Sequence, residues 1–221
     1  MPSKIDIVNM ALSRLMTSKT LASIDEPRPE AVQMRIWYDQ TLDRLLSIPE
    51  HEWGFARTFT ALSVSEFEMP GWDFTYAYPS DCLGLRVVGP RHAGAVNIGT
   101  GYPHEVGRNG DYLLIGSNCR DAHAVYTSRV SEARMPAAFI DALVFALAAN
   151  TAMPITSSPQ LAQQMQQGAA SALHAAMARD KNNDHMLPEP LPASVRYRLG
   201  DDCYDHVPTN DTYDPWGLNR G

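Results

Sequence analysis

Cysteines, basic side chains and long apolar runs are all scarce in this sequence. Its 221 residues include only Cys82, Cys119 and Cys203, an odd and scattered set that predicts a reducing compartment and no disulfide framework. Eighteen Lys and Arg against 25 Asp and Glu give a formal net charge of -7, which argues against tight, sequence-independent binding of nucleic acid. Runs of roughly 20 apolar residues, the length that spans a bilayer, are missing, and the N-terminus has no apolar signal core. We therefore expect a soluble protein made in the cytoplasm, with no membrane partner.

Enzyme and metal signatures are also missing. The sequence has no Gly-x-Ser-x-Gly, His-Glu-x-x-His or Cys-x-x-Cys motif and no phosphate-binding loop. Cys203 and His206 are spaced like half of a zinc site, but a structural zinc ion needs four protein ligands and no second pair exists. We expect no catalytic residue, no cofactor and no metal. A catalytic site assembled in space from residues far apart in the chain remains an alternative.

The N-terminal quarter predicts two antiparallel helices. Ser3 and Asp6 have the spacing of a capping box, and apolar residues follow at helical intervals up to about residue 17. Pro27 and Pro29 open a second helix, because proline is tolerated in a first turn. Pro49 ends that helix. A short connection between two such helices favours an antiparallel pair.

The middle third changes to the alternating pattern of β-strands. Leu62 and Val64 alternate with serines, and further strand-like stretches cover residues 83–88, 112–115 and 122–130. Asn109-Gly110 is a good two-residue hairpin turn. The aromatic residues Trp53, Phe55 and Phe59 follow the second helix, so we expect them to seal the junction between the helical and β parts.

Helical spacing returns at residue 136. The stretch 136–152 is apolar on all sides, which predicts a helix buried centrally in a bundle or against another subunit. A further helix over 158–180 carries a thin apolar stripe among Ala and Gln, which favours a close-packed or oligomeric neighbour.

These patterns predict an α+β fold with three parts. Residues 1–56 and 132–185 form a four-helix core, residues 57–131 a small antiparallel β lobe, and residues 186–221 an extended C-terminal arm. The arm is rich in proline and Asp, yet it carries four large aromatic residues that a spacer does not need: Tyr197, Tyr204, Tyr213 and Trp216. An arm that folds onto a partner fits both features, and an arm that wraps its own domain is the alternative.

The order of several motifs resembles the head-to-tail adaptor family of short-tailed bacteriophages, called tail tubular protein A in one large branch. In chain order these motifs are Ile7-Val8-Asn9-Met10-Ala11-Leu12, Trp37-Tyr38-Asp39, Trp53-Gly54-Phe55-Ala56, Tyr76-Ala77-Tyr78-Pro79-Ser80-Asp81-Cys82-Leu83 and Phe139-Ile140-Asp141-Ala142-Leu143. The resemblance covers about residues 5 to 180. Met16 departs from it, standing where glycine is usual, so we expect the first helix to run a little further. Three residues also separate Pro49 from Trp53, where the family has them adjacent.

The resemblance implies a structural virion protein rather than an enzyme. Adaptors of this family form a ring, commonly of twelve copies, below the portal protein; DNA passes through it without specific binding, and the ring supports the tail nozzle and possibly tail fibres. We expect this location for the chain, at the head-tail junction, and we expect the arm to bind the portal or a neighbouring copy. The alternatives are a head-completion or stopper protein of another type of tailed phage and, less favoured, a phage enzyme.

Overall fold

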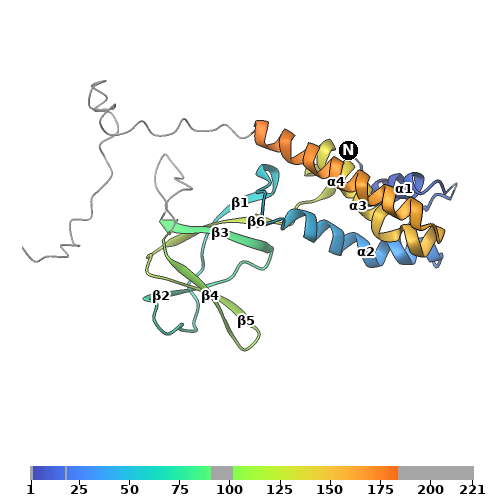
Figure 1. Cartoon of the computed structure of the whole chain (residues 1–221). Helices are drawn as coiled ribbons and strands as arrows, with labels where there is room; N and C mark the ends of the chain where they lie inside the picture. Colours follow the sequence, from blue (N-terminus) through green and yellow to red (C-terminus); the bar gives the residue numbers. More distant parts are fainter. Residues whose placement is uncertain (1, 18, 91–101, 184–221) are drawn as a thin grey trace, which may run out of the picture. The chain divides into compact units, whose positions relative to one another are not determined.

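A computed structural model describes residues 2–17, 19–90 and 102–183 of the chain. Four α-helices and two three-stranded antiparallel sheets give a mixed α+β fold, as the sequence predicts (Figure 1). All of these residues belong to one compact unit, which ends at Asp184. The predicted arm and its four aromatic residues lie outside the described residues.

The elements follow one another in the order helix pair, strands, helix pair. The helices are α1 (Lys4–Arg14), α2 (Pro29–Leu46), α3 (Ala137–Thr156) and α4 (Pro159–Asn183). The strands are β1 (Arg57–Ala61), β2 (Phe74–Ala77), β3 (Cys82–Pro90), β4 (His104–Asn109), β5 (Tyr112–Ser117) and β6 (Ala122–Ser128). Two short 3-10 helices, Gly54–Ala56 and Glu132–Arg134, lie where the chain passes between helices and strands.

Local sequence signals set the start of the first helix pair. The capping box is present, because Ser3 Oγ accepts a hydrogen bond from the Asp6 N–H and the Asp6 carboxylate accepts one from the Ser3 N–H. These bonds hold the pKa of the Asp6 carboxyl below its usual range. Pro29 occupies the first turn of α2 as expected.

The connection between α1 and α2 is fixed by one side chain. The Asn9 amide donates to the carbonyl oxygen of Leu21 and its oxygen accepts from the Leu21 N–H, both at 2.9 Å. The expected extension of α1 is wrong: the helix ends at Arg14, and Met16 adopts the left-handed conformation with φ +57°.

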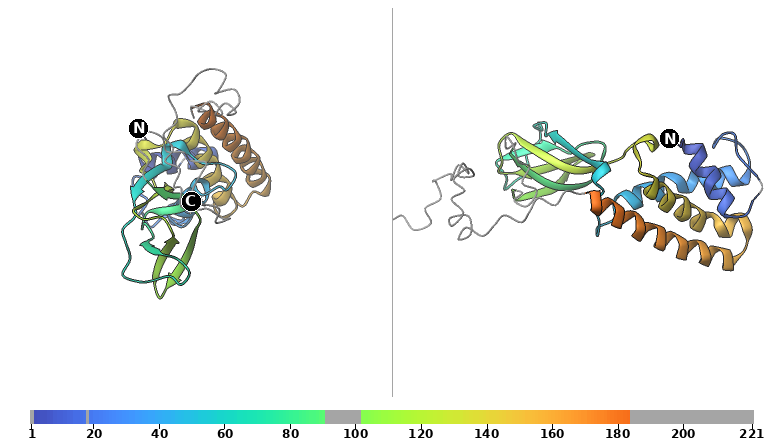
Figure 2. Two further views of the ribbon diagram at one scale, coloured as in Figure 1. Left: turned by 90° about the vertical axis from the view of Figure 1, so that its left-hand side faces the viewer. Right: turned by 90° about the horizontal axis from the view of Figure 1, so that it is seen from above.

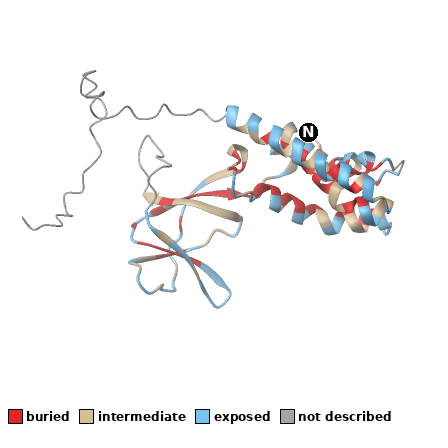
Figure 3. Cartoon of the chain, viewed as in Figure 1, coloured by how far each residue is buried: buried red, intermediate tan, exposed pale blue. Residues whose placement is uncertain are grey.

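Helix α3 is the centre of the helical core, as its apolar composition predicts (Figure 3). It packs against α1, α2 and α4, and Phe139, Leu143 and Leu147 are fully buried. By length and composition alone α3 would also suffice to cross a membrane, but 56% of its apolar window is buried inside the protein. Burial among three helices accounts for that composition.

The first sheet has the strand order β1-β6-β3 and the second the order β2-β5-β4. Arg57 pairs with Thr127, so the strand that enters the β region lies directly beside the one that leaves it (Figure 2). A hairpin forms where it is predicted, but its turn is shifted by one residue: Asn109 still pairs with Tyr112, and the two turn residues are Gly110, at φ +58°, and Asp111.

The strand expected at Leu62 and Val64 lies before them instead, at Arg57–Ala61, because these five residues pair with β6. Val64 makes only an isolated bridge to Tyr76 of β2. Phe59 is 54% exposed, so the expectation that it seals the junction is wrong.

Trp53 and Phe55 do pack at the junction. The Trp53 ring lies 4.9 Å from that of Phe139, the Phe55 ring lies 5.0 Å from the same ring, and the indole of Trp53 donates to the carbonyl oxygen of Leu45 at 2.8 Å.

Two glycines let the loop between β1 and β2 lie on the second sheet. A Cβ added to Gly116 would lie 2.5 Å from the Trp72 ring, and one added to Gly107 would lie 2.7 Å from the Met69 methyl group. The Trp72 indole also donates to the Glu105 carboxylate at 3.0 Å. Glycine is therefore a packing requirement at position 116, whereas at position 107 the flexible end of the Met69 side chain can move aside.

Candidate functional site

Metal-binding clusters and reactive thiols were sought first among the described residues. Among them, no three His, Cys, Asp or Glu side chains converge as a metal site would require. Burial raises the pKa of the thiols of Cys82 and Cys119, which keeps both protonated and weakly nucleophilic. Cys203 and His206 lie outside the described part of the chain, as do Tyr197, Tyr204, Tyr213 and Trp216.

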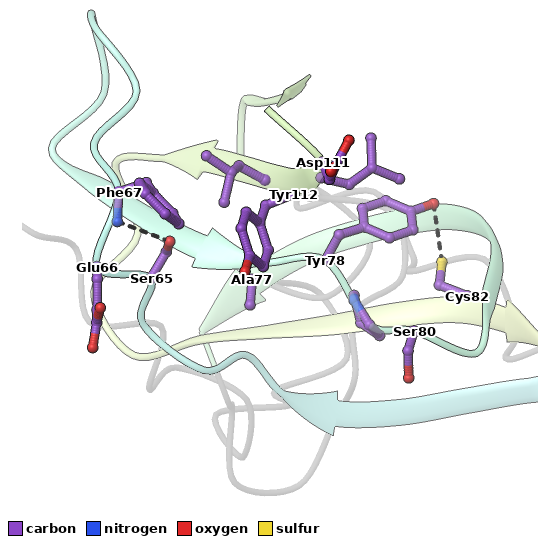
Figure 4. A pocket seen from close by; sticks show the side chains of 12 residues that line it. Ser65, Glu66, Phe67, Ala77, Tyr78, Ser80, Cys82, Asp111 and Tyr112 are labelled. Carbon is purple, nitrogen blue, oxygen red and sulfur yellow. Dashed lines mark hydrogen bonds between the residues drawn. The ribbon is translucent and has the colours of Figure 1, made fainter. Parts of the chain in front are cut away.

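A hollow of about 560 Å³, which we call the lobe hollow, opens on the β region (Figure 4). Its lining comes from the segment before β2, the end of β2 and the β4–β5 hairpin: Ser65, Glu66, Phe67, Ala77, Tyr78, Pro79, Ser80, Cys82, Asp111, Tyr112, Leu113 and Leu114. The Cys82 thiol donates to the Tyr78 hydroxyl at 3.2 Å. Burial, together with this thiol, raises the pKa of Tyr78 to about 12, so the hollow presents a neutral phenol.

Exposed aromatic side chains form one wall of the lobe hollow. The rings of Phe67 and Tyr112 lie 5.3 Å apart, and both residues are exposed, as is Leu113. Exposed apolar side chains that gather in one place mark interaction surfaces more often than catalytic ones.

The segment that carries Phe67 is negatively charged, whereas Asp111 of the hairpin wall is paired with Arg108 at 3.4 Å. Glu66 and Glu68 flank Phe67 in the chain, and Asp73 and Asp81 follow, while residues 58–85 contain no Lys, Arg or His. A positively charged partner would therefore bind here more favourably than a neutral one.

The segment next to the hollow is the outer edge of the second sheet. The Ser65 N–H donates to the carbonyl oxygen of Thr75, and the Ala77 N–H donates to that of Ser63, both at 2.8 Å. Residues 63–65 therefore act as a short edge strand beside β2. Because backbone groups alternate in direction along a strand, the N–H and C=O of Val64 point away from the sheet, and Val64 is 72% exposed.

A second hollow, of about 880 Å³, lies on the helical core and is called here the methionine groove. It is lined by Asp6, Asn9, Met10, Ser13, Arg14, Met16, Asp141, Val144, Phe145, Gln164 and Met165. The Arg14 guanidinium lies 4.5 Å above the Phe145 ring. That ring reaches the backbone of α4 because Gly168 has no side chain; a Cβ there would lie 2.8 Å from it.

The exposed surface of α4 carries no charge over most of its length. Residues 159–178 include no Asp, Glu, Lys or Arg, although only Ala162, Met165 and Ala176 of α4 are buried. The exposed residues of this stretch, called here the uncharged α4 face, are Pro159, Gln160, Gln163, Gln164, Gln166, Gln167, Ala170, Ser171, His174, Ala175 and Ala178. A solvent-facing helix surface usually carries charged residues.

Ion pairs join the end of the β region to α2. The Arg129 guanidinium contacts Asp39 at 2.9 Å and Asp43 at 3.0 Å, and Lys4 contacts Asp39 at 3.3 Å. These groups are 38 to 53% exposed, so each pair adds little stability.

Sequence reasoning did not identify either hollow. Their linings combine residues from three or more separate elements, which no spacing along the chain reveals. The uncharged run in α4 and the alternation Glu66-Phe67-Glu68 were visible as signals in the sequence. Compared with known proteins, the sequence matches no family model, and no curated protein sequence matches it.

Proposed function

We propose that this chain is a structural virion protein, the head-to-tail adaptor of a short-tailed bacteriophage. Twelve copies would form a ring between the portal protein and the tail nozzle, at the head-tail junction of the virion. The observation that carries the proposal is the order of elements: a helix pair, an antiparallel β lobe and a second helix pair. Motifs resembling those of the adaptor family occur in the same order along these elements.

The surfaces of the helical core support assembly with further copies. The uncharged α4 face and the methionine groove differ in character and share only Gln164. A closed ring requires such a heterologous pair, because each copy presents a different surface to each of its two neighbours. Methionine side chains adapt to irregular partners and are frequent on binding surfaces.

The charge of the chain supports passage of DNA through the ring. A formal net charge of -7 per copy would give a twelve-membered ring a strongly negative character, and like charge keeps phosphates from adhering to the wall. The arm aromatics Tyr197, Tyr204, Tyr213 and Trp216 would serve as contacts to the portal or a neighbouring copy. Tail fibre proteins are a further possible partner.

Native mass spectrometry tests the proposal. The purified full-length chain is measured alone and after mixing with the portal protein of the same phage. A closed ring, or a stoichiometric complex with the portal, is the expected result. A monomer under both conditions would turn the interpretation to a stopper protein or an enzyme.

Substitutions on the uncharged α4 face test which surface forms the ring. Ala175→Arg places a charge on the exposed part of this face and should abolish the ring while leaving the circular dichroism spectrum unchanged. Asn182→Arg is the matched control, since Asn182 is exposed on the same helix but lies outside the uncharged run. Equal assembly of both variants would exclude α4 from the subunit interface.

A further inference from the structure

The lobe hollow, together with Val64 and Glu68, which line an adjoining hollow, combines three features that suit one kind of ligand. The outward N–H and C=O of Val64 offer main-chain hydrogen bonds along an open sheet edge. Phe67 and Tyr112 offer an aromatic wall, and Glu66 and Glu68 flank that wall with negative charge. An extended peptide that adds to a sheet edge gains affinity from its backbone and specificity from alternate side chains.

Charge and alternation define that peptide further. Its apolar side chains must alternate with its basic ones, because successive side chains of an extended segment point to opposite sides. Phe67 stands between two glutamates, so a peptide with an aromatic residue between two basic residues would match it in both aromatic packing and opposite charge.

This chain contains one such sequence outside its described residues. Residues 195–199 read Val-Arg-Tyr-Arg-Leu, so Val195, Tyr197 and Leu199 alternate with Arg196 and Arg198. These two arginines are the only basic residues between 182 and 219 apart from His185 and His206. The positive charge of this region is therefore concentrated beside Tyr197.

We infer that the lobe hollow of one copy binds residues 195–199 of a second copy. The segment lies along residues 63–65, Tyr197 packs against Phe67 and Tyr112, and the two arginines pair with Glu66 and Glu68. This inference assigns Tyr197 to the neighbouring copy and leaves Tyr204, Tyr213 and Trp216 for the portal.

The choice of a second copy rests on the proposed ring. The hollow and the segment form an unlike, complementary pair on each chain, and such a pair links copies head to tail. Eleven residues lie between Asn183, the end of α4, and Val195, and the twelve steps of an extended chain span about 40 Å. This reach is sufficient for a contact between neighbouring subunits.

Photo-crosslinking in the full-length chain tests the inference. Phe67 is replaced by benzoylphenylalanine, and the variant is mixed with 15N-labelled wild-type chain before irradiation. The expected product has the mass of two chains, and its cross-linked peptide includes residues 195–199 from the labelled copy. Phe59 is the matched control position, since it is exposed on β1 away from the hollow, and it should give no cross-link to this segment.

A charge exchange separates specific binding from chance proximity. Glu66→Arg with Glu68→Arg should reduce the cross-link by about tenfold, since two partly exposed attractive pairs become repulsive. Adding Arg196→Glu and Arg198→Glu should restore it. A cross-link to another segment, a cross-link within one chain, or a cross-link unaffected by the exchange overturns the inference. A ring seen by native mass spectrometry without this cross-link would overturn it and leave the adaptor proposal intact.

Discussion

The imidazole of His51 lies 2.8 Å from the carboxylate of Asp180, although 129 positions separate the two residues in the chain. Both side chains are almost fully buried, and the same carboxylate oxygen accepts a hydrogen bond from the Gly54 N–H at 3.1 Å. The contact joins the last turn of α4 to the segment that leads from α2 into β1.

Asp180→Ala should therefore destabilise the protein strongly. The substitution leaves the ring of His51 and the N–H of Gly54 without this acceptor in a buried place, at a cost of about 2 to 3 kcal/mol. Urea unfolding monitored by circular dichroism measures the loss. Lys181→Ala, one residue further along the same helix and exposed, should change the free energy of unfolding by less than about 0.5 kcal/mol. Equal effects of the two substitutions would show that the contact contributes nothing.

Met16→Gly should stabilise the chain. Met16 has φ +57° just after the end of α1, a conformation that costs a residue with a Cβ roughly 1 kcal/mol and costs glycine little. The side chain is 82% exposed, so little packing is lost. Thermal and urea unfolding should show a gain of about 0.5 to 1 kcal/mol.

Met10→Gly is the control, because it should lower the free energy of unfolding where Met16→Gly should raise it. Met10 lies inside α1, where glycine costs about 1 kcal/mol relative to good helix formers. A loss of stability in both variants would mean that Met16 makes contacts that outweigh its backbone strain.

Gly116→Ala should disturb the β region. Its new Cβ would lie 2.5 Å from the ring of Trp72, so the loop that carries Trp72 must move and the Trp72–Glu105 hydrogen bond weakens. Overpacking of this kind costs roughly 1 to 3 kcal/mol.

Gly84→Ala provides the comparison, because nothing lies within 4 Å of a Cβ at that position. It should be neutral, or stabilising by a few tenths of a kcal/mol through the unfolded chain. Tryptophan fluorescence should change in the Gly116 variant alone.

The Glu30 carboxylate should make the free energy of unfolding depend on pH in the acid range. The Lys19 ammonium, 2.7 Å away, holds the pKa of Glu30 below its usual value. The unfolded chain therefore takes up the proton first as the pH falls. The stabilisation is complete above about pH 4.5, the ordinary value, and is lost as the pH falls through the folded-state pKa.

Unfolding of Glu30→Gln and of the parent chain between pH 7 and pH 3 measures this effect. The difference in free energy should shrink toward low pH. In a Lys19→Met background the same comparison should depend much less on pH, and an unchanged pH dependence there would assign the effect to another partner of Glu30.

Much of the fold was predictable because its signals are local. The capping box at Ser3, the first-turn proline at position 29 and the existence of a hairpin near Gly110 depend on adjacent backbone, so residue type is sufficient to predict them. The apolar composition of α3 also predicted its burial. Each of these expectations is confirmed in the structure.

The expectations that failed concern residues whose backbone conformation is set by tertiary contacts. β1 has no apolar alternation of its own, and its strand conformation follows from pairing with β6. Met16 adopts a glycine-like conformation because the chain must turn toward Leu21, which the Asn9 side chain holds. The lobe hollow depends on Phe67 meeting Tyr112 across 45 positions, a relationship that no local pattern contains.

Because Arg57 pairs with Thr127, the chain enters the β region and leaves it at two neighbouring points. Paired residues on neighbouring strands are about 5 Å apart, so a link of two or three residues would bridge the gap. The strands could thus be exchanged or enlarged at one place in the chain, provided that the packing of Leu83 of β3 against the helical core is kept. Such an insertion lets natural variation reshape one module while the helices that surround α3 keep their packing.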